Sequence, residues 1–290
     1  SHNRYRIYYP KTMGDAVWSM YDYNRGCCDN ICYSGVADIF RLPKFSLSFF
    51  RTQIAEGSML PSGKMPYEVF IPAYRDEILS DTVMVYGNVG EVELVLNGKT
   101  IRRQTADKGP DSDYIPVPNG GNGKNLHFPP FTFYGVSKER GVLKAVGYHQ
   151  GKKVAEYTVK TPGVPERLDI TYFESGKPAT KNDLLIVYVR MLDKQGVLCP
   201  VNGIPVELSV QGGEIVGPTS YPLEAGVASF LVRTGEISKI NINATGKGFS
   251  TRKYEFYEGY CYLCNAIYVC LCTSQRGEVF TITSAVACFY

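Results

Sequence analysis

From residue 67 onward, short runs of the sequence alternate apolar and polar residues, and this period of two limits most of the chain to β-strands. In the first part of this region, strands are predicted at residues 67–71, 82–86, 91–96, 131–133, 142–148 and 153–159. Asn97-Gly98 directly follows one of these runs, and this dipeptide is typical of a tight β-hairpin turn. Short strands with regular turn signals predict an immunoglobulin-like β-sandwich over residues 67–162.

A second set of strands begins after Pro162-Gly163-Val164-Pro165, whose prolines interrupt the pattern. Strands of this set are predicted at residues 167–173, 184–192, 206–210, 227–232 and 240–244. Turns that contain glycine connect them, so a second immunoglobulin-like β-sandwich is expected over residues 165–256. The tail at residues 257–290 is rich in Cys and Tyr and follows neither strand pattern, which leaves its structure open.

The first 55 residues follow a different pattern, that of a single β/α unit. A short apolar run carries Trp18, the one tryptophan of the sequence, and ends in the polar turn 22–26. Pro43 fits the first turn of a helix whose apolar face extends to about Ile54, and residues 56–66 are expected to form a linker. One β/α unit cannot bury both of its faces, so we expect residues 1–55 to be the last piece of a larger fold encoded upstream.

Composition and charge argue against several classes of function. The 290 residues are 44% hydrophobic and 20% charged, as in an ordinary globular protein of two or three domains. The net charge of +3 is spread along the chain and gives no reason to expect a nucleic-acid partner or a membrane surface. No apolar run is long enough to cross a bilayer, so no membrane span is expected.

The nine cysteines are odd in number and irregular in spacing, which is a poor basis for a disulfide framework. Four of them form the tail pattern Cys261-x-x-Cys264 with Cys270-x-Cys272, which invites a zinc site. The spacing in the second pair is unusual for tetrahedral coordination, so we expect no metal and no cofactor. A fused or misread segment is the favoured explanation of this tail.

Several runs of the sequence occur in the order found in one known family. They are Trp18-Ser19-Met20-Tyr21-Asp22-Tyr23-Asn24-Arg25-Gly26, Gly35-Val36-Ala37-Asp38, Pro43-Lys44, Phe49-Phe50, Val83-Met84-Val85-Tyr86-Gly87-Asn88, Glu91-Val92-Glu93-Leu94-Val95-Leu96-Asn97-Gly98-Lys99, Pro129-Pro130-Phe131-Thr132-Phe133 and residues 182–193. The runs before residue 55 resemble the end of the catalytic barrel in glycoside hydrolase family 2, the β-galactosidase-like enzymes. The later runs resemble the accessory β-sandwiches that follow this barrel. The expected fold is therefore mainly β, with two immunoglobulin-like β-sandwiches preceded by the last β/α unit of a truncated (β/α)₈ barrel.

The resemblance implies an active site at the C-terminal ends of the barrel strands and retaining hydrolysis by two glutamates roughly 5 Å apart. Residues 1–53 contain four aspartates, Asp15, Asp22, Asp29 and Asp38, and no glutamate. We therefore expect both catalytic residues upstream of this chain, so that the chain has no catalytic residue and is inactive by itself. It would be a scaffold or accessory region of an enzyme that acts on a β-glycoside or oligosaccharide.

The resemblance also selects three candidate substrate-binding residues. Trp18 would form an apolar wall under a sugar ring, because sugar C–H groups stack on an aromatic face. The alternative is a tryptophan buried in the core. Asp22 and Arg25 either bind sugar hydroxyls or pair with each other to hold the turn, and the ion pair is the favoured alternative.

A different class of function stays open. The chain would then be a freestanding glycan-binding or adhesive protein with two tandem β-sandwiches, and residues 1–55 would be a vestige whose apolar faces lack partners. A periplasmic or secreted location follows from the family resemblance alone, and nothing in the sequence itself supports it. The glycoside that the whole enzyme would cut is likewise left open.

Overall fold

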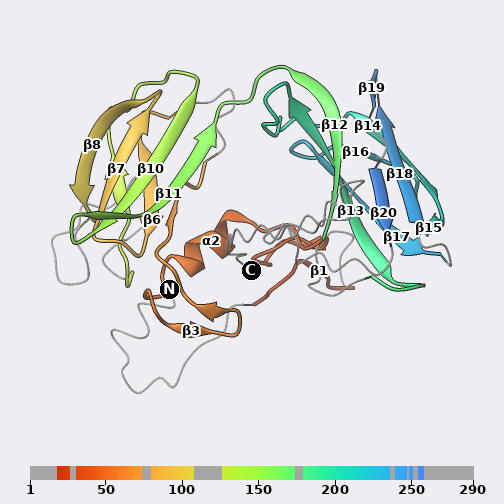
Figure 1. Cartoon of the computed structure of the whole chain (residues 1–290), viewed down its shortest axis with the longest axis horizontal. Coiled ribbons are helices and arrows are strands. Elements are labelled where there is room, and N and C mark those ends of the chain that lie inside the picture. Colours follow the sequence, from red (N-terminus) through yellow and green to blue (C-terminus); the bar gives the residue numbers. More distant parts are fainter. Residues whose placement is uncertain are drawn as a thin grey trace, which may run out of the picture. The chain divides into compact units, whose positions relative to one another are not determined.

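The computed structural model describes residues 18–26, 31–73, 80–107, 126–173, 179–235, 239–246, 248–250 and 254–257. It confirms the mainly β fold class, because the described elements are strands apart from the short helix α2 (Phe45–Arg51) (Figure 1). The chain divides into two compact units, Ser1–Thr161 and Pro162–Tyr290. Each unit contains antiparallel sheets around one apolar core, the organisation expected of a β-sandwich.

In the first unit, one sheet has the strand order β5-β6-β9 and the other β11-β10-β7-β8. The strands are β5 (Val69–Phe70), β6 (Val83–Gly87), β7 (Glu91–Leu96), β8 (Lys99–Thr105), β9 (Phe131–Phe133), β10 (Val142–His149) and β11 (Lys152–Lys160). In β7, Val92, Leu94 and Leu96 are buried and the residues between them are half-buried, so the period of two is present. The β7–β8 hairpin turns at Asn97 and Gly98, which both have the positive φ of a type I′ turn.

The second unit repeats this plan with different strands. One sheet has the order β12-β13-β17-β15, and the other has β16-β14-β18-β19 with β20 also paired to β18. The strands are β12 (Pro165–Tyr172), β13 (Leu184–Asp193), β14 (Pro205–Gln211), β15 (Gly213–Ile215), β16 (Ser220–Pro222), β17 (Val227–Thr234), β18 (Lys239–Gly246), β19 (Phe249–Ser250) and β20 (Tyr254–Tyr257). Val187 and Phe230 from one sheet and Leu208 and Ile242 from the other belong to one buried cluster.

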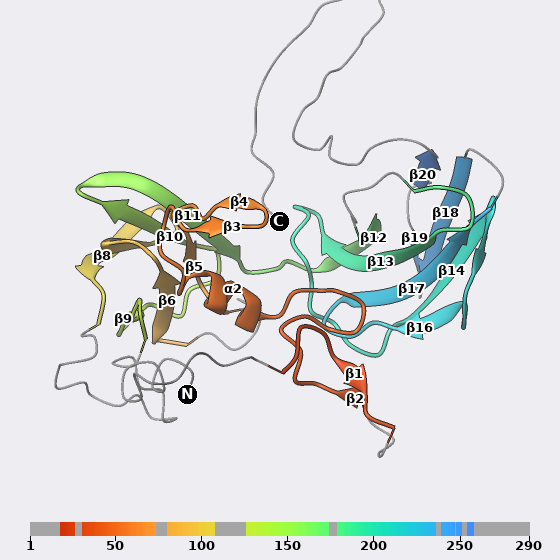
Figure 2. The same cartoon turned by 90° about the horizontal axis from the view of Figure 1, so that it is seen from below.

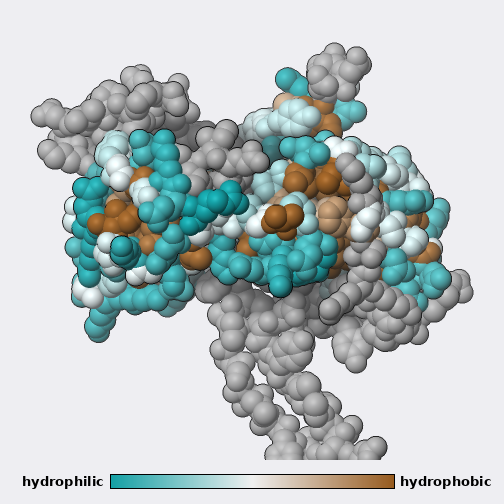
Figure 3. Space-filling view, turned by 90° about the horizontal axis from the view of Figure 1, so that it is seen from above, coloured by the Kyte–Doolittle hydropathy of each residue, from teal (hydrophilic) through white to brown (hydrophobic). Residues whose placement is uncertain are grey.

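Each sandwich has a buried apolar core of its own. Phe131, Phe133 and Leu94 of the first core and Val187 of the second are fully buried. Burial of one such side chain contributes about 1.5–3 kcal/mol to the stability of its sandwich. On the face seen in Figure 3, hydrophobic residues form small groups within a mostly hydrophilic surface.

The N-terminal segment, defined here as residues 18–26 and 31–66, has little regular structure. Its elements are β1 (Tyr23–Asn24), β2 (Ile31–Cys32), α2, β3 (Met59–Leu60) and β4 (Gly63–Lys64). The helix expected after Pro43 is confirmed, but it ends at Arg51 and buries none of its residues. The linker prediction for residues 56–66 is wrong, because β3 and β4 pair as a hairpin and Met65 beside them is 1% exposed.

Polar and aromatic contacts attach the N-terminal segment to the first sandwich. Phe45 and Phe49 of α2 make edge-on ring contacts with Phe70 of β5 and Tyr86 of β6, beside which α2 lies in Figure 2. Arg51 at the end of the helix pairs with Glu68. These contacts fix α2 against one sheet of the sandwich.

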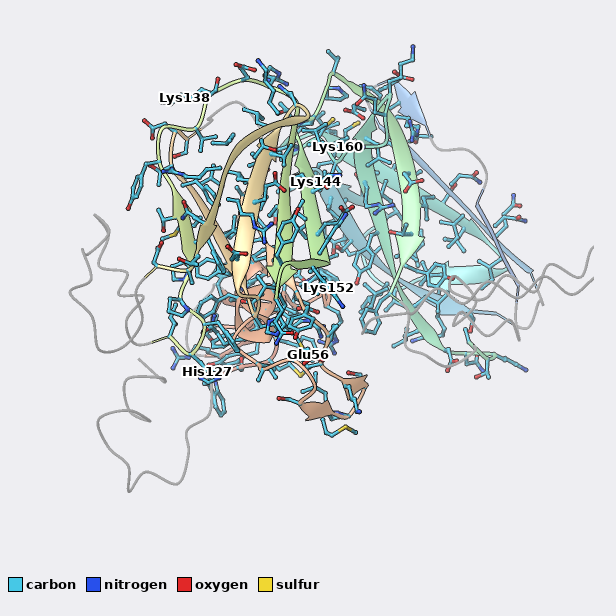
Figure 4. The ribbon with its side chains drawn as sticks, turned by 60° about the vertical axis from the view of Figure 1, so that its left-hand side comes forward. Glu56, His127, Lys138, Lys144, Lys152 and Lys160 are labelled. Carbon is cyan, nitrogen blue, oxygen red and sulfur yellow. The ribbon has the colours of Figure 1, made fainter. Side chains whose placement is uncertain are left out.

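Two amides extend this attachment beyond the helix. The Asn88 Nδ2 atom donates to the carbonyl oxygens of Ile54 (3.0 Å) and Pro66 (2.9 Å). Gln53 exchanges two hydrogen bonds with the Phe128 backbone, at 3.0 and 3.1 Å. Glu56 and His127, the sequence neighbours of this contact, lie at one end of the sandwich, away from Lys138 at the other (Figure 4).

Candidate functional site

The backbone around Trp18 is held by a second stretch of chain. Ser19 N–H donates to the Ser34 carbonyl (3.3 Å), and Val36 N–H donates back to the Ser19 carbonyl (3.1 Å). Tyr21 then forms a parallel bridge with Ala37, a buried residue. The peptide bond between Trp18 and Ser19 is cis. The main chain is thus placed by hydrogen bonds, independently of what the Trp18 side chain contacts.

The Trp18 indole lies at the surface. It is 75% exposed, so the alternative of a tryptophan buried in the core is wrong for this chain. Its Nε1–H donates to the Tyr23 hydroxyl at 2.7 Å, and the two rings meet edge to face at 6.0 Å and 79°. Within the described part of the chain, this hydrogen bond is the polar contact of the indole. The arrangement leaves an oriented aromatic surface open to solvent.

Asp22 is buried and holds the turn together. Its Oδ1 atom accepts the Gly35 N–H at 2.9 Å and pairs with Lys44 Nζ at 2.6 Å. The Lys44 ammonium also donates to the Tyr33 carbonyl at 3.1 Å. A Cβ at Gly35 would lie 2.3 Å from the Asp22 backbone nitrogen, so this close approach requires glycine. The carboxylate therefore joins three stretches of the N-terminal segment.

Arg25 takes no part in this anchor. The ion pair of Asp22 is made with Lys44, and among the described residues none joins Asp22 to Arg25, so the pairing expected inside the turn is not formed. Arg25 is exposed near the end of β1. The structure thus separates the two charged candidates, one buried and engaged, the other at the surface.

Sequence reasoning missed the roles of Tyr23, Cys32 and Lys44. Tyr23 and Cys32 are directly opposite each other in the β1–β2 pair. Cys32 is a free thiol, and hydrogen bonds from the Ser34 and Tyr23 side chains lower its pKa, with a smaller contribution from the charge of Arg25. The motif around Pro43 contained Lys44, but a separation of 22 residues gave no signal that it pairs with Asp22.

The remaining candidate chemistry is limited in the described residues. No group of three or more His, Cys, Asp or Glu side chains there is arranged to hold a metal ion. None of the described helices has the length and apolar character needed to cross a membrane. Cys27, Cys28 and the tail cysteines from Cys261 onward lie outside the described residues.

Comparison with known proteins adds sequence relatives. A β-galactosidase from Thermoanaerobacter pseudethanolicus is 32% identical over 241 residues, which cover 78% of this chain and 30% of that enzyme. A β-galactosidase sequence from Rhizobium radiobacter is 30% identical over 132 residues, covering 45% of this chain and 94% of the relative. Residues 80–155 match a family described as a domain of unknown function (DUF4982).

Solved structures give the same fold. A β-glycosidase from Bacteroides vulgatus superimposes with a TM-score of 0.68 at 17% identity, over 89% of this chain and 32% of that one. This likeness concerns the fold alone. The chain spans about 30% of the length of the first β-galactosidase it matches and about a third of this β-glycosidase. The family is shown by the two β-galactosidase relatives, one of which is 30% identical and covered over 94% of its length: the chain belongs to glycoside hydrolase family 2 and is β-galactosidase-like.

Proposed function

We propose that this chain is the C-terminal portion of a retaining β-glycosidase of the β-galactosidase type and serves there as a non-catalytic scaffold. The two relatives described above are named β-galactosidases, and the chain spans 30% of the length of the first of them. In this proposal residues 1–55 are the end of the catalytic barrel, and residues 67–162 and 165–256 are accessory β-sandwiches. Tyr257 ends strand β20 and pairs with Lys239, so the tail of this proposal begins at residue 258, and residues 258–290 lie outside the described residues.

The two catalytic glutamates belong upstream of the chain in this proposal. Residues 1–53 contain no glutamate, and the first one, Glu56, follows α2. A retaining enzyme needs one carboxyl group as acid and base and a second as nucleophile, roughly 5 Å apart. The chain by itself then binds sugar or supports the catalytic barrel, and hydrolysis of the O-glycosidic bond requires the complete enzyme.

One observation supports a direct part in sugar binding, namely the 75% exposed indole of Trp18 on a backbone that is held in place. An aromatic face presents a large apolar surface that suits the C–H face of a pyranose. We assign Trp18 the role of a wall under the sugar ring. Arg25 is exposed and free of the Asp22 anchor, which suits contact with sugar hydroxyls, whereas Asp22 serves the site by holding the turn.

Hydrolysis of an aryl β-galactoside tests this proposal. The purified chain should show no turnover, and the native gene product should cleave the substrate. Trp18→Ala introduced into the native product should lower kcat/KM by roughly tenfold or more, as expected for loss of an aromatic contact with the substrate. Turnover by the chain alone would contradict the assignment of both glutamates to an upstream region, and an unchanged kcat/KM would remove the role given to Trp18.

A further inference from the structure

The orientation of the exposed Trp18 indole depends on the few contacts that the ring makes. Trp18 is 75% exposed, and an indole with so little packing has several accessible rotamers. A sugar that stacks on a mobile ring must also immobilise it, which weakens binding. A contact that fixes the ring in advance would therefore act directly on the affinity of the site.

Tyr23 provides such a contact. Its hydroxyl oxygen accepts the Trp18 Nε1–H at 2.7 Å, a short and well-formed hydrogen bond. The indole N–H lies in the plane of the ring, so this contact occupies the edge of the indole and leaves its faces available. The interplanar angle of 79° with the Tyr23 ring agrees with an edge contact.

The place of Tyr23 is itself fixed from the other side. Tyr23 lies in β1 and pairs with Cys32 of β2, and its ring is half-buried. The Cys32 thiol interacts with the side chains of both Ser34 and Tyr23, at 3.4 Å from the Ser34 hydroxyl oxygen. As a hydroxyl, the Tyr23 side chain can accept from the indole and still donate its own hydrogen. This gives a chain of contacts from β2 to Trp18.

We propose that Tyr23 is a positioning residue for Trp18: its hydroxyl fixes the edge of the indole so that the aromatic face is held ready for a sugar ring. The inference rests on the function proposed above, since it concerns the sugar wall. It assigns no chemistry to Tyr23. The residue acts only through the indole.

The chain offers a direct test, because Trp18 is its one tryptophan and therefore the source of its tryptophan fluorescence. Time-resolved anisotropy of Trp18 is measured for the unaltered chain, Tyr23→Phe and the control Tyr33→Phe. Tyr33 is a 74% exposed neighbour whose ring faces Lys44, 5.9 Å away, and the same hydroxyl group is removed. Circular dichroism and urea unfolding check that the sandwiches stay folded in all three proteins.

The expected result is a clear increase in the amplitude of fast indole motion for Tyr23→Phe alone, with an unchanged free energy of unfolding. If Tyr23 had a merely structural role, Tyr23→Phe would instead lower the free energy of unfolding and leave the motion of the indole unchanged. Equal anisotropy in Tyr23→Phe and the unaltered chain would overturn the inference.

Titration with methyl β-galactopyranoside separates this inference from the proposed function. Quenching of Trp18 fluorescence gives the dissociation constant of the sugar. A dissociation constant about threefold to tenfold higher in Tyr23→Phe than in the unaltered chain, the effect of one neutral hydrogen bond, supports both. A rise in indole motion without sugar quenching in any variant supports the positioning contact and contradicts Trp18 as a sugar wall in this chain.

Discussion

The first β-sandwich and the N-terminal segment are stabilised by different interactions. In β7 of the sandwich, every second residue is buried, and the core includes side chains such as Phe131 that are 0% exposed. In the N-terminal segment, α2 buries no residue, and Trp18 and Met59 are 75% and 73% exposed. The segment is held by ring contacts of α2 with the sandwich and by polar anchors, among them the pair of Asp22 with Lys44.

The two regions therefore differ in what their surfaces can do. A region that covers its own apolar residues is stable alone, whereas a region that exposes aromatic side chains on a fixed backbone presents a surface to something else. Under the proposed function, that surface belongs to a larger barrel and to a sugar. The predictions below test this contrast, from the largest expected effect to the smallest.

A core substitution should separate the two regions most clearly. Phe131→Ala should lower the free energy of unfolding by about 3–5 kcal/mol, because it leaves a cavity in a fully buried site. Trp18→Ala should change it by less than about 0.5 kcal/mol, since the indole is exposed. Urea unfolding followed by circular dichroism measures both. A large loss of stability in Trp18→Ala would mean that the indole is a packing residue.

A buried carboxylate in the second sandwich gives a smaller effect that depends on pH. Burial opposes ionisation of Asp193, but backbone N–H donors outweigh it and hold its pKa below the usual range. They come from Gly163 (2.7 Å), Gln195 and Val197 (both 2.8 Å), with a weaker contribution from the charge of Arg167.

The sign of this pH dependence follows from the lowered pKa. The stabilisation is complete above the unfolded pKa of about 3.9 and is lost as pH falls through the lower folded value. Asp193→Ala should cost roughly 2–3 kcal/mol at neutral pH by leaving N–H groups unpaired, and should weaken this acid dependence. The measurement is urea unfolding between neutral pH and pH about 3. If the loss of stability at acid pH were the same in Asp193→Ala as in the unaltered chain, another group would be responsible for it.

The polar anchor of the N-terminal segment should control local opening. Asp22→Ala should destabilise the segment by roughly 1–2 kcal/mol, a value reduced because Lys44 is about a third exposed. Limited proteolysis between residues 22 and 44 should then speed up by about tenfold. Arg25→Ala is the matched control and should leave the rate unchanged, because its side chain lies at the surface. Equal acceleration in both variants would refute Asp22 as the specific anchor.

The smallest effect concerns the reactivity of two thiols, Cys32 in the N-terminal segment and the buried Cys199 in the second sandwich. Hydrogen bonds from Ser34 and Tyr23 lower the pKa of Cys32, whereas burial and then the charge of Asp193 raise that of Cys199. Because the thiolate is the nucleophile, Cys32 should react with iodoacetamide faster, and its rate should reach half-maximum at a lower pH. Peptide-resolved mass spectrometry gives both rates. Faster labelling of Cys199 in the folded chain would reverse the contrast.

Much of the fold was predictable because its signals are local. Asn97-Gly98 after the run 91–96 indicated the hairpin turn, although β8 itself was not among the predicted strands, and the alternation in β17 indicated a strand with one buried face. The short strands β15 and β16 were missed because three residues carry no period. Residues 56–66 were misread because Gly and Ser occur in tight hairpins as well as in linkers.

The site was predictable only in part. Trp18 was selected through a resemblance, and its exposure could not be read from an apolar run. The partner of Asp22 depends on how the loop before Gly35 and the start of α2 come together, which no local spacing encodes. Tyr23 was part of the quoted motif, but its contact with the indole requires the β1–β2 pairing to be known.

The central claim, that this chain is one end of a larger family-2 glycosidase, is tested most directly by the intact mass of the native gene product. An antibody raised against residues 67–256 would isolate that product from source cells for mass spectrometry. The account predicts a species far heavier than the 32.3 kDa of this chain, able to cleave an aryl β-galactoside. A native species of 32.3 kDa would contradict it and favour a freestanding glycan-binding protein.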